Sequence, residues 1–175
     1  MLSTPFLYEE SLSPEDFQKI GELLLRCSHI EHVLGNCLKA MLRITDEEAI
    51  VMVFPLGIEH RFQRIKELAK SADLNAEAKA ALVELAATLS HVQTARNDLA
   101  HGIINDKEDE PTFHRRSNRR SVSKDDAFSA EELINFVAHA TLSLRLALGG
   151  YGKEEGRHIL PPRPPIPMYL GSPGK

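Results

Sequence analysis

The residues best suited to chemistry lie in one short segment near the middle of the chain, Arg96–His101. Arginine is permanently charged and binds phosphate through paired N–H donors, whereas histidine takes up and releases protons near neutral pH. Arg96 and His101 stand about one and a half helical turns apart. Asn97 stands one turn before His101, where its amide can orient the imidazole ring. The segment therefore predicts a site for a phosphate group.

The apolar repeat around this segment gives Arg96 an unusual position. Apolar residues recur at alternating steps of three and four, the pattern of one buried helix face, at Leu82, Leu85, Leu89, Val92 and Leu99. Arg96 occupies the step between the last two. Because burying an unpaired charge is costly, we expect Arg96 to be paired or to face a polar cleft. The alternative, cations that only stabilise a helix end, accounts for His101 better than for Arg96.

A candidate acidic partner for Arg96 lies in the first helical stretch. Glu31 falls within the apolar series formed by Leu24, Leu34 and Leu38. We hypothesise that Glu31 pairs with Arg96 and holds the guanidinium extended, which requires the two side chains to lie within about 6 Å. The alternative is that Glu31 only flanks a wide apolar face. Asp98 is a second supporting residue of the candidate site.

Capping signals and apolar periodicity predict the helices that must position these residues. Serine, threonine or asparagine caps precede three of the helical stretches, and Pro55, Gly57 and Gly102 interrupt or end them. The expected helices cover about 14–43, a short stretch that begins at 45 and ends before Pro55, then 58–71 and 75–101. A capping box at Ser129–Glu132 opens a last helix, which ends at Gly149.

Residues 102–128 differ in composition from the helices on either side. An acidic stretch is followed by His114–Arg120, which holds four arginines in seven residues. Thr112-Phe113 and Ser121-Val122 flank this run and can pair as a short hairpin with a basic tip. The candidate RNA-binding residues of the tip are Arg115, Arg116, Arg119 and Arg120. The alternative is a solvated loop that offsets the acidic stretch.

These elements predict an all-α protein, an up-and-down helical bundle of four to five helices with a short hairpin or loop insert before the last helix. The bundle occupies residues 1–150. A Pro/Gly-rich C-terminal tail follows over 151–175 and is expected to be extended, either as a docking ligand or as a plain spacer.

Composition limits the classes of function. A net charge of −4 excludes a global basic field, so any binding of nucleic acid must rest on a local patch. The N-terminus lacks the basic region of a signal peptide, and no apolar run approaches the roughly 20 residues that span a bilayer. The two cysteines, Cys27 and Cys37, lie ten residues apart on one expected helix and cannot bridge within it. Free thiols of this kind favour the cytoplasm, without a membrane partner.

The histidines and cysteines do not form a metal-binding pattern. His29 is two residues from Cys27, which places it on another side of a helix, and no second ligand pair accompanies Cys27 and His32. The Glu-x-x-His pairs of di-iron bundles are also lacking. We therefore expect no metal and no other cofactor.

The pattern Arg96-Asn97-x-x-x-His101 at the end of a bundle helix resembles the signature of the HEPN superfamily (higher eukaryotes and prokaryotes nucleotide-binding domains). That signature is an arginine, usually followed by a polar residue, with a histidine four to six residues after the arginine. The helices of 14–148, with a long first helix and an insert before the last, are similar to the bundle of that family. The motif is short, and the helix and the glycine after it add to its specificity.

This resemblance implies a metal-independent endoribonuclease of the kind found among toxins and antiviral systems. Arg96 and His101 would be catalytic, and Asn97 would position them. A 2′-hydroxyl would attack the adjacent phosphorus while histidine moves protons and arginine stabilises the charge that develops on phosphate oxygens. Each chain supplies one such pair, so the resemblance also implies a homodimer that joins two motifs in one cleft.

A neutralising, antitoxin-like protein is a further implied partner. However, family members that are silenced by nucleotidylation carry a tyrosine two residues after the histidine, and Ile103 stands there in this chain. A function of another class also stays open, namely a non-catalytic helical module that binds a nucleotide or a protein, in which Arg96 serves structure. An Arg96 sealed against Glu31 would favour that module, and an Arg96 that opens onto a basic cleft would favour RNA.

Overall fold

The computed structural model describes residues 12–105, 112–115 and 120–149, and its first helix begins where the sequence predicts. Helix α1 covers Pro14–Leu42. The Ser13 hydroxyl accepts the Asp16 N–H at 3.1 Å, and the Asp16 carboxylate accepts the Ser13 N–H at 2.9 Å. This capping box satisfies two N–H groups that have no partner within the helix. Arg43 follows the helix as its C-terminal cap, and its φ of 56° lies in the left-handed region.

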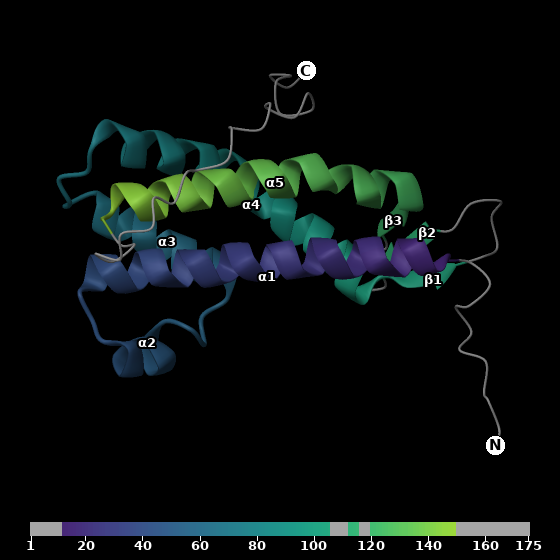
Figure 1. Ribbon diagram of the computed structural model, residues 1–175, viewed down its shortest axis with the longest axis horizontal. Coiled ribbons are helices and arrows are strands. Elements are labelled where there is room, and N and C mark those ends of the chain that lie inside the picture. Colours follow the sequence, from purple (N-terminus) through teal and green to yellow (C-terminus); the bar gives the residue numbers. More distant parts are fainter. Residues whose placement is uncertain (1–11, 106–111, 116–119, 150–175) are drawn as a thin grey trace.

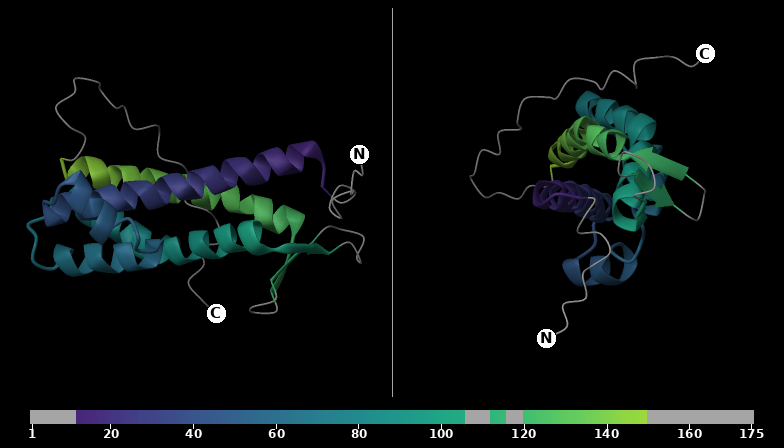
Figure 2. Two further views of the ribbon diagram at one scale, coloured as in Figure 1. Left: turned by 90° about the horizontal axis from the view of Figure 1, so that it is seen from below. Right: turned by 90° about the vertical axis from the view of Figure 1, so that its right-hand side faces the viewer.

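Two further helices also follow the predicted caps, and a third follows a glycine without a side-chain cap. Helix α2 (Asp46–Met52) begins with a capping box between Thr45 and Glu48, and α3 (Ile58–Ala69) follows Gly57. Asn75 caps α4 (Ala76–His101) by accepting the Ala78 N–H at 2.8 Å. The short helix α2 stands apart from the bundle beside α1 (Figures 1 and 2). Its side chains Ile50, Val51 and Met52 are all exposed.

The insert forms a small antiparallel sheet of strands β1 (Ile103–Asn105), β2 (Thr112–Arg115) and β3 (Arg120–Ser123), in that order. Phe113 pairs with Val122 in β2 and β3, which confirms the predicted hairpin. Strand β1 was not predicted. The sheet lies at the end of the bundle where α4 ends and α1 begins (Figure 2).

The start predicted for the last helix at Ser129 is wrong. Helix α5 covers Lys124–Ala147 and follows β3 directly. Ser123 is its cap and accepts the Asp126 N–H at 3.1 Å. The Ser129 hydroxyl instead donates to the Asp126 carbonyl at 2.7 Å, inside the first turns. A serine followed by acidic residues is a capping signal at either position, and the sequence alone does not rank the two.

The long helices α1, α4 and α5 form the bundle, with α3 packed on α1 and α4 (Figure 1). The predicted all-α bundle class is confirmed. The core consists mainly of aliphatic side chains, among them Leu34, Leu85, Ile134 and Leu144. In the described part of the chain, no helix has the length and apolar content needed to cross a bilayer.

Gly102 is required by a close approach between α4 and β2. Its φ of −68° is open to any residue, so the left-handed cap that a helix-ending glycine suggests is not formed. A Cβ at this position would overlap the Asp98 carbonyl oxygen and would lie 2.8 Å from Cβ of Phe113. Backbone must therefore shift to admit any side chain.

We predict that Gly102→Ala lowers the free energy of unfolding by about 1 to 3 kcal/mol, the usual cost of overpacking. Urea denaturation measures this change. Gly21→Ala is the matched control, because a Cβ at Gly21 meets nothing within 4 Å and an alanine in a helix interior is favoured over glycine. Equal stability of Gly102→Ala and the wild type would contradict the prediction.

Candidate functional site

The structure brings Arg96, Asn97 and His101 together at the end of α4. One guanidinium nitrogen of Arg96, Nη1, lies 3.2 Å from Nε2 of His101 and 3.1 Å from Oδ1 of Asn97. The last turns of α4 provide this spacing. The predicted role of Asn97 changes, because its amide oxygen accepts from Arg96 and does not bond to the imidazole. The side chains of Arg96 and His101 are exposed.

The expectation that Arg96 occupies a buried slot is wrong. Ala95 lies against the core in its place, between the buried Val92 and Leu99. The buried face of α4 therefore continues through position 95, and Arg96 projects from its edge into solvent. A guanidinium at the edge keeps most of its hydration and needs no buried partner.

In the described residues, no salt bridge within 4 Å joins Glu31 and Arg96, and their predicted separation of about 6 Å or less stays a prediction. Glu31 is half-buried on α1 and lines the same cavity as Arg96. Its backbone carbonyl accepts a hydrogen bond of 2.6 Å from Arg61. An Arg96 sealed against Glu31 would have favoured a non-catalytic module, but Arg96 is exposed. An Arg96 that opens onto a basic cleft would have favoured RNA, but the cavity beside it is also lined by the Glu31 carboxylate.

The buried arginine of this region is Arg61 on α3, which the sequence analysis missed. Its guanidinium donates to the carbonyls of Glu31 and Phe54 at 2.6 Å each, and Nε donates to the Val53 carbonyl at 3.3 Å. The side chain is 6 % exposed. Burial lowers the pKa of Arg61, while the Glu31 carboxylate opposes that change. Arg61 thus fixes the α2–α3 connection to α1.

Phe54 completes this attachment. Its ring stacks on His32 of α1 at a centroid distance of 5.7 Å, and the Arg61 guanidinium lies 5.7 Å from its centroid. A Cβ at Gly35 would lie 2.7 Å from the Phe54 ring, so glycine gives the ring its place on α1. These contacts hold Gly57, the residue before α3, beside the middle of α1.

A cavity of about 110 Å³ opens beside Arg96, between α1, the start of α3 and α4. Its lining residues are Cys27, Ser28, Glu31, Gly57, Ile58, Val92, Gln93 and Arg96. Burial raises the pKa of the Cys27 thiol to about 11, an effect that Arg96 opposes and Glu31 reinforces. Cys27 is therefore a protonated thiol at neutral pH and is not activated as a nucleophile.

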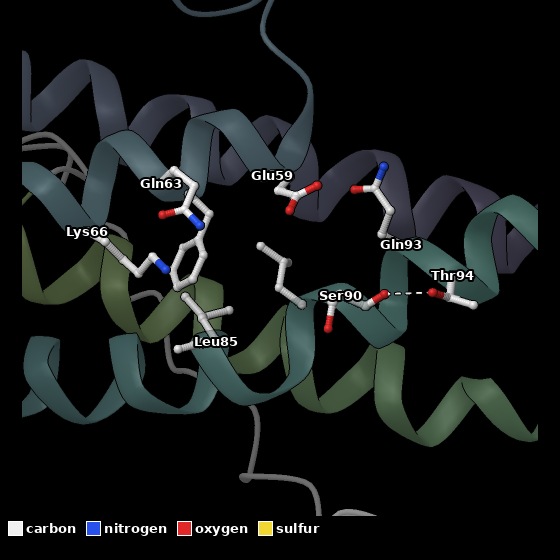
Figure 3. Close-up of a pocket in the computed structure, with 10 residues that line it drawn as sticks. Glu59, Gln63, Lys66, Leu85, Ser90, Gln93 and Thr94 are labelled. Carbon is white, nitrogen blue, oxygen red and sulfur yellow. Dashed lines mark hydrogen bonds between the residues drawn. The ribbon is translucent and has the colours of Figure 1, made fainter.

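A larger cavity of about 410 Å³ lies between α3 and α4 and includes neither Arg96 nor His101. Figure 3 shows Lys66 near one end of it and Gln93 at the other. The two cavities share Gln93, which separates them. Sequence reasoning did not single out Gln93. Its position four residues after Leu89 places it beside the buried face, which is the signal that could have found it.

The remaining candidate residues have different placements. Asp98 is buried, its carbonyl accepts the Gly102 N–H at 2.9 Å, and its side chain lines a cavity of about 310 Å³ between α4 and α5. Arg115 and Arg120 face each other in the backbone register of β2 and β3. Arg116 and Arg119, and the tail 151–175, lie outside the described residues. The predicted RNA-binding role of the arginines stays a prediction.

No metal site is found in the described residues, where His, Cys, Asp and Glu do not gather in groups of three or more. Burial also raises the pKa of Cys37 to about 12, so this thiol is protonated at neutral pH. Cys27 and Cys37 are free thiols in the structure. Comparison of the chain with known protein families, with curated proteins and with solved structures finds no match.

Proposed function

We propose that this chain is a metal-independent endoribonuclease of the toxin or antiviral-defence type that acts in the cytoplasm as a homodimer. The observation that carries the proposal is the contact of 3.2 Å between Nη1 of Arg96 and Nε2 of His101. Both side chains are exposed, so a phosphodiester and a second copy of the chain can reach them. An antitoxin-like protein that covers this surface is part of the same proposal.

The proposal gives His101 one tautomer before substrate binds. Arginine has donors and no acceptor, so a hydrogen bond from Arg96 has Nε2 of His101 as its acceptor and places the ring proton on Nδ1. A neutral imidazole with a lone pair on Nε2 is the form that a general base requires. When the phosphate of RNA binds Arg96 in place of His101, that lone pair is released beside the substrate.

The reaction then follows from these two groups. Nε2 of His101 accepts the proton of the 2′-hydroxyl while the 2′-oxygen forms a bond to the adjacent phosphorus. Arg96 stabilises the negative charge on the non-bridging oxygens. The bond from phosphorus to the 5′-oxygen breaks, and this oxygen takes a proton from a second, protonated histidine. The products are a 2′,3′-cyclic phosphate and a 5′-hydroxyl.

The second histidine is the reason for the homodimer. One chain contributes one Arg96–His101 pair, and a base and an acid are needed on opposite sides of the phosphorus. A twofold axis next to the exposed end of α4 would supply His101 of both copies to one cleft.

A second candidate function is a non-catalytic module that binds a nucleotide. The observation that favours it is the Glu31 carboxylate in the cavity beside Arg96, since this cavity is not lined by basic groups alone. Such a module would bind nucleotides and leave RNA intact.

The test is an RNA cleavage assay in the presence of a metal chelator, with wild type and His101→Ala. We expect the wild type to cleave RNA to cyclic phosphate ends, and His101→Ala to be at least about 100-fold slower. RNA with a 2′-deoxy sugar at the cleavage site should stay intact. His139→Ala, on α5, is the matched control for loss of a histidine. Equal cleavage by wild type and His101→Ala would rule out the catalytic role, and intact RNA with both would favour the module.

A further inference from the structure

The cavity beside Arg96 contains polar groups that the proposed reaction does not use. Glu31 and Ser28 line it from α1, and Gln93 lines it from α4. The half-buried Glu31 carboxylate makes no hydrogen bond to any described residue. A ligand in this cavity that supplies a donor to that carboxylate is therefore favoured.

The free groups of this cavity are mostly acceptors. A carboxylate accepts only, and the hydroxyl of Ser28 already donates its hydrogen to the Leu24 carbonyl at 3.0 Å, which leaves its lone pairs. Gln93 also lines the cavity, but Figure 3 shows its Oε1 turned toward Glu59 in the neighbouring cavity of about 410 Å³, so it does not add to these acceptors. The ligand must therefore present N–H or O–H donors toward Glu31. Arg96 at the rim adds a positive charge, which suits a phosphate outside the cavity and disfavours a cationic ligand.

Guanine is the RNA base that matches this pattern. Its N1–H and N2–H₂ groups are adjacent and point the same way, so one carboxylate can accept from both. Adenine and cytosine each present one amino group next to an acceptor nitrogen. Uracil presents one N–H between two carbonyls. In each of these three bases, a carboxylate that accepts from the donor also faces the lone pair of a neighbouring acceptor. The O6 atom of guanine requires a donor. Gly57 and Ile58 line the same cavity at the start of α3, where the first N–H groups have no partner within the helix and no side-chain cap.

We propose that the cavity lined by Glu31, Ser28 and Gln93 binds a guanine base, and that Arg96 binds the phosphate attached to that nucleoside. The inference rests on the proposed function, because it makes the chain a ribonuclease that cleaves next to guanine. The volume of about 110 Å³ is small beside the several hundred Å³ of cavities for whole ligands, so it takes the donor edge of the base and leaves the sugar outside. Unstacked bases of single-stranded RNA present this edge.

The test measures binding of GMP, AMP, CMP and UMP to the full chain by calorimetry. We expect the wild type to bind GMP at least about tenfold more tightly than the other three, because a site built to bond a donor rejects ligands that lack it. Glu31→Gln should remove this preference. The substitution leaves the backbone carbonyl that Arg61 holds in place, and an unchanged melting temperature will confirm the fold.

Glu59→Gln is the matched control, since Glu59 is exposed and lines the neighbouring cavity of about 410 Å³. Gln93→Leu is a second control, which removes at similar size a polar side chain that lines both cavities, and it should keep the GMP preference. Equal affinities for the four nucleotides, or a GMP preference that persists in Glu31→Gln, would overturn the inference. If the chain prefers GMP but does not cleave RNA, the guanine site is supported and the proposed ribonuclease function is overturned. If it cleaves RNA without a preference for GMP, the ribonuclease function is supported and the guanine site is overturned.

Discussion

Replacing Arg96 by alanine is expected to slow RNA cleavage by about 100- to 1000-fold, the usual loss when a donor to the developing oxyanion is removed. The loss should fall mainly on kcat, because the negative charge on the phosphate oxygens increases in the transition state. The cleavage rate of Arg96→Lys should lie between those of the wild type and Arg96→Ala, since lysine keeps the charge without the paired N–H groups. Single-turnover cleavage in chelator gives these rates.

A second measurement separates this role from a structural one. Nitrogen NMR of the His101 ring should show the proton on Nδ1 in the wild type, because Arg96 donates to Nε2. In Arg96→Ala that donor is gone, and the proton should be shared between the two ring nitrogens. Arg64→Ala, which removes an exposed arginine from α3, is the control for both measurements. An Arg96→Ala variant that cleaves at the wild-type rate would contradict the catalytic assignment.

Replacing Arg61 by leucine is expected to lower the free energy of unfolding by about 3 to 5 kcal/mol. The substitution removes three hydrogen bonds from a charged donor, to the carbonyls of Glu31, Val53 and Phe54. The Val53 carbonyl keeps the Leu56 N–H at 3.0 Å, and the Glu31 carbonyl lies inside α1. A hydrogen bond to a charged group contributes about 1.5 to 3 kcal/mol, and a buried acceptor left without a partner costs about 1 to 3 kcal/mol. Urea denaturation, followed by circular dichroism of the helices, measures the change.

Arg64→Leu is the matched control for this prediction, because Arg64 lies on the same helix and is exposed. It should change stability by less than about 0.5 kcal/mol. Arg61→Lys tests whether charge alone is enough, and we expect it to recover only part of the loss, since one ammonium cannot span the three carbonyls. If Arg61→Leu also changes the free energy of unfolding by less than about 0.5 kcal/mol, then other contacts hold the α2–α3 connection to α1.

The two arginines show where sequence reasoning succeeds and where it fails. The rule that flagged Arg96, a charge within an apolar repeat, holds for Arg61, which lies among Ile58, Phe62 and Ile65 on the buried face of α3. On α4 the repeat is ambiguous because Ala95 fits an apolar position as well as an exposed one. The spacing of Arg96 and His101, by contrast, is a local helical property, and their contact follows directly from it.

The helix boundaries that the sequence predicts correctly depend mostly on interactions between residues that are close in the chain. The caps at Ser13, Thr45 and Asn75 each use a side chain within four residues of the N–H it accepts, so the sequence contains the whole interaction. Strand β1 depends on pairing with β2 across an intervening segment, and three residues carry too little pattern to reveal it. The cavity beside Arg96 joins three helices, and no periodicity within one of them can predict it.

The direct junctions of the small sheet have a consequence for its position. Gly102 alone separates His101 from β1, and β3 passes into α5 without an intervening residue. The first strand of the sheet is therefore connected to α4 and the last strand to α5, and Phe113 of the middle strand is buried. The position of the sheet is thus fixed by the ends of two bundle helices, and the first of these, α4, ends at His101 of the candidate site.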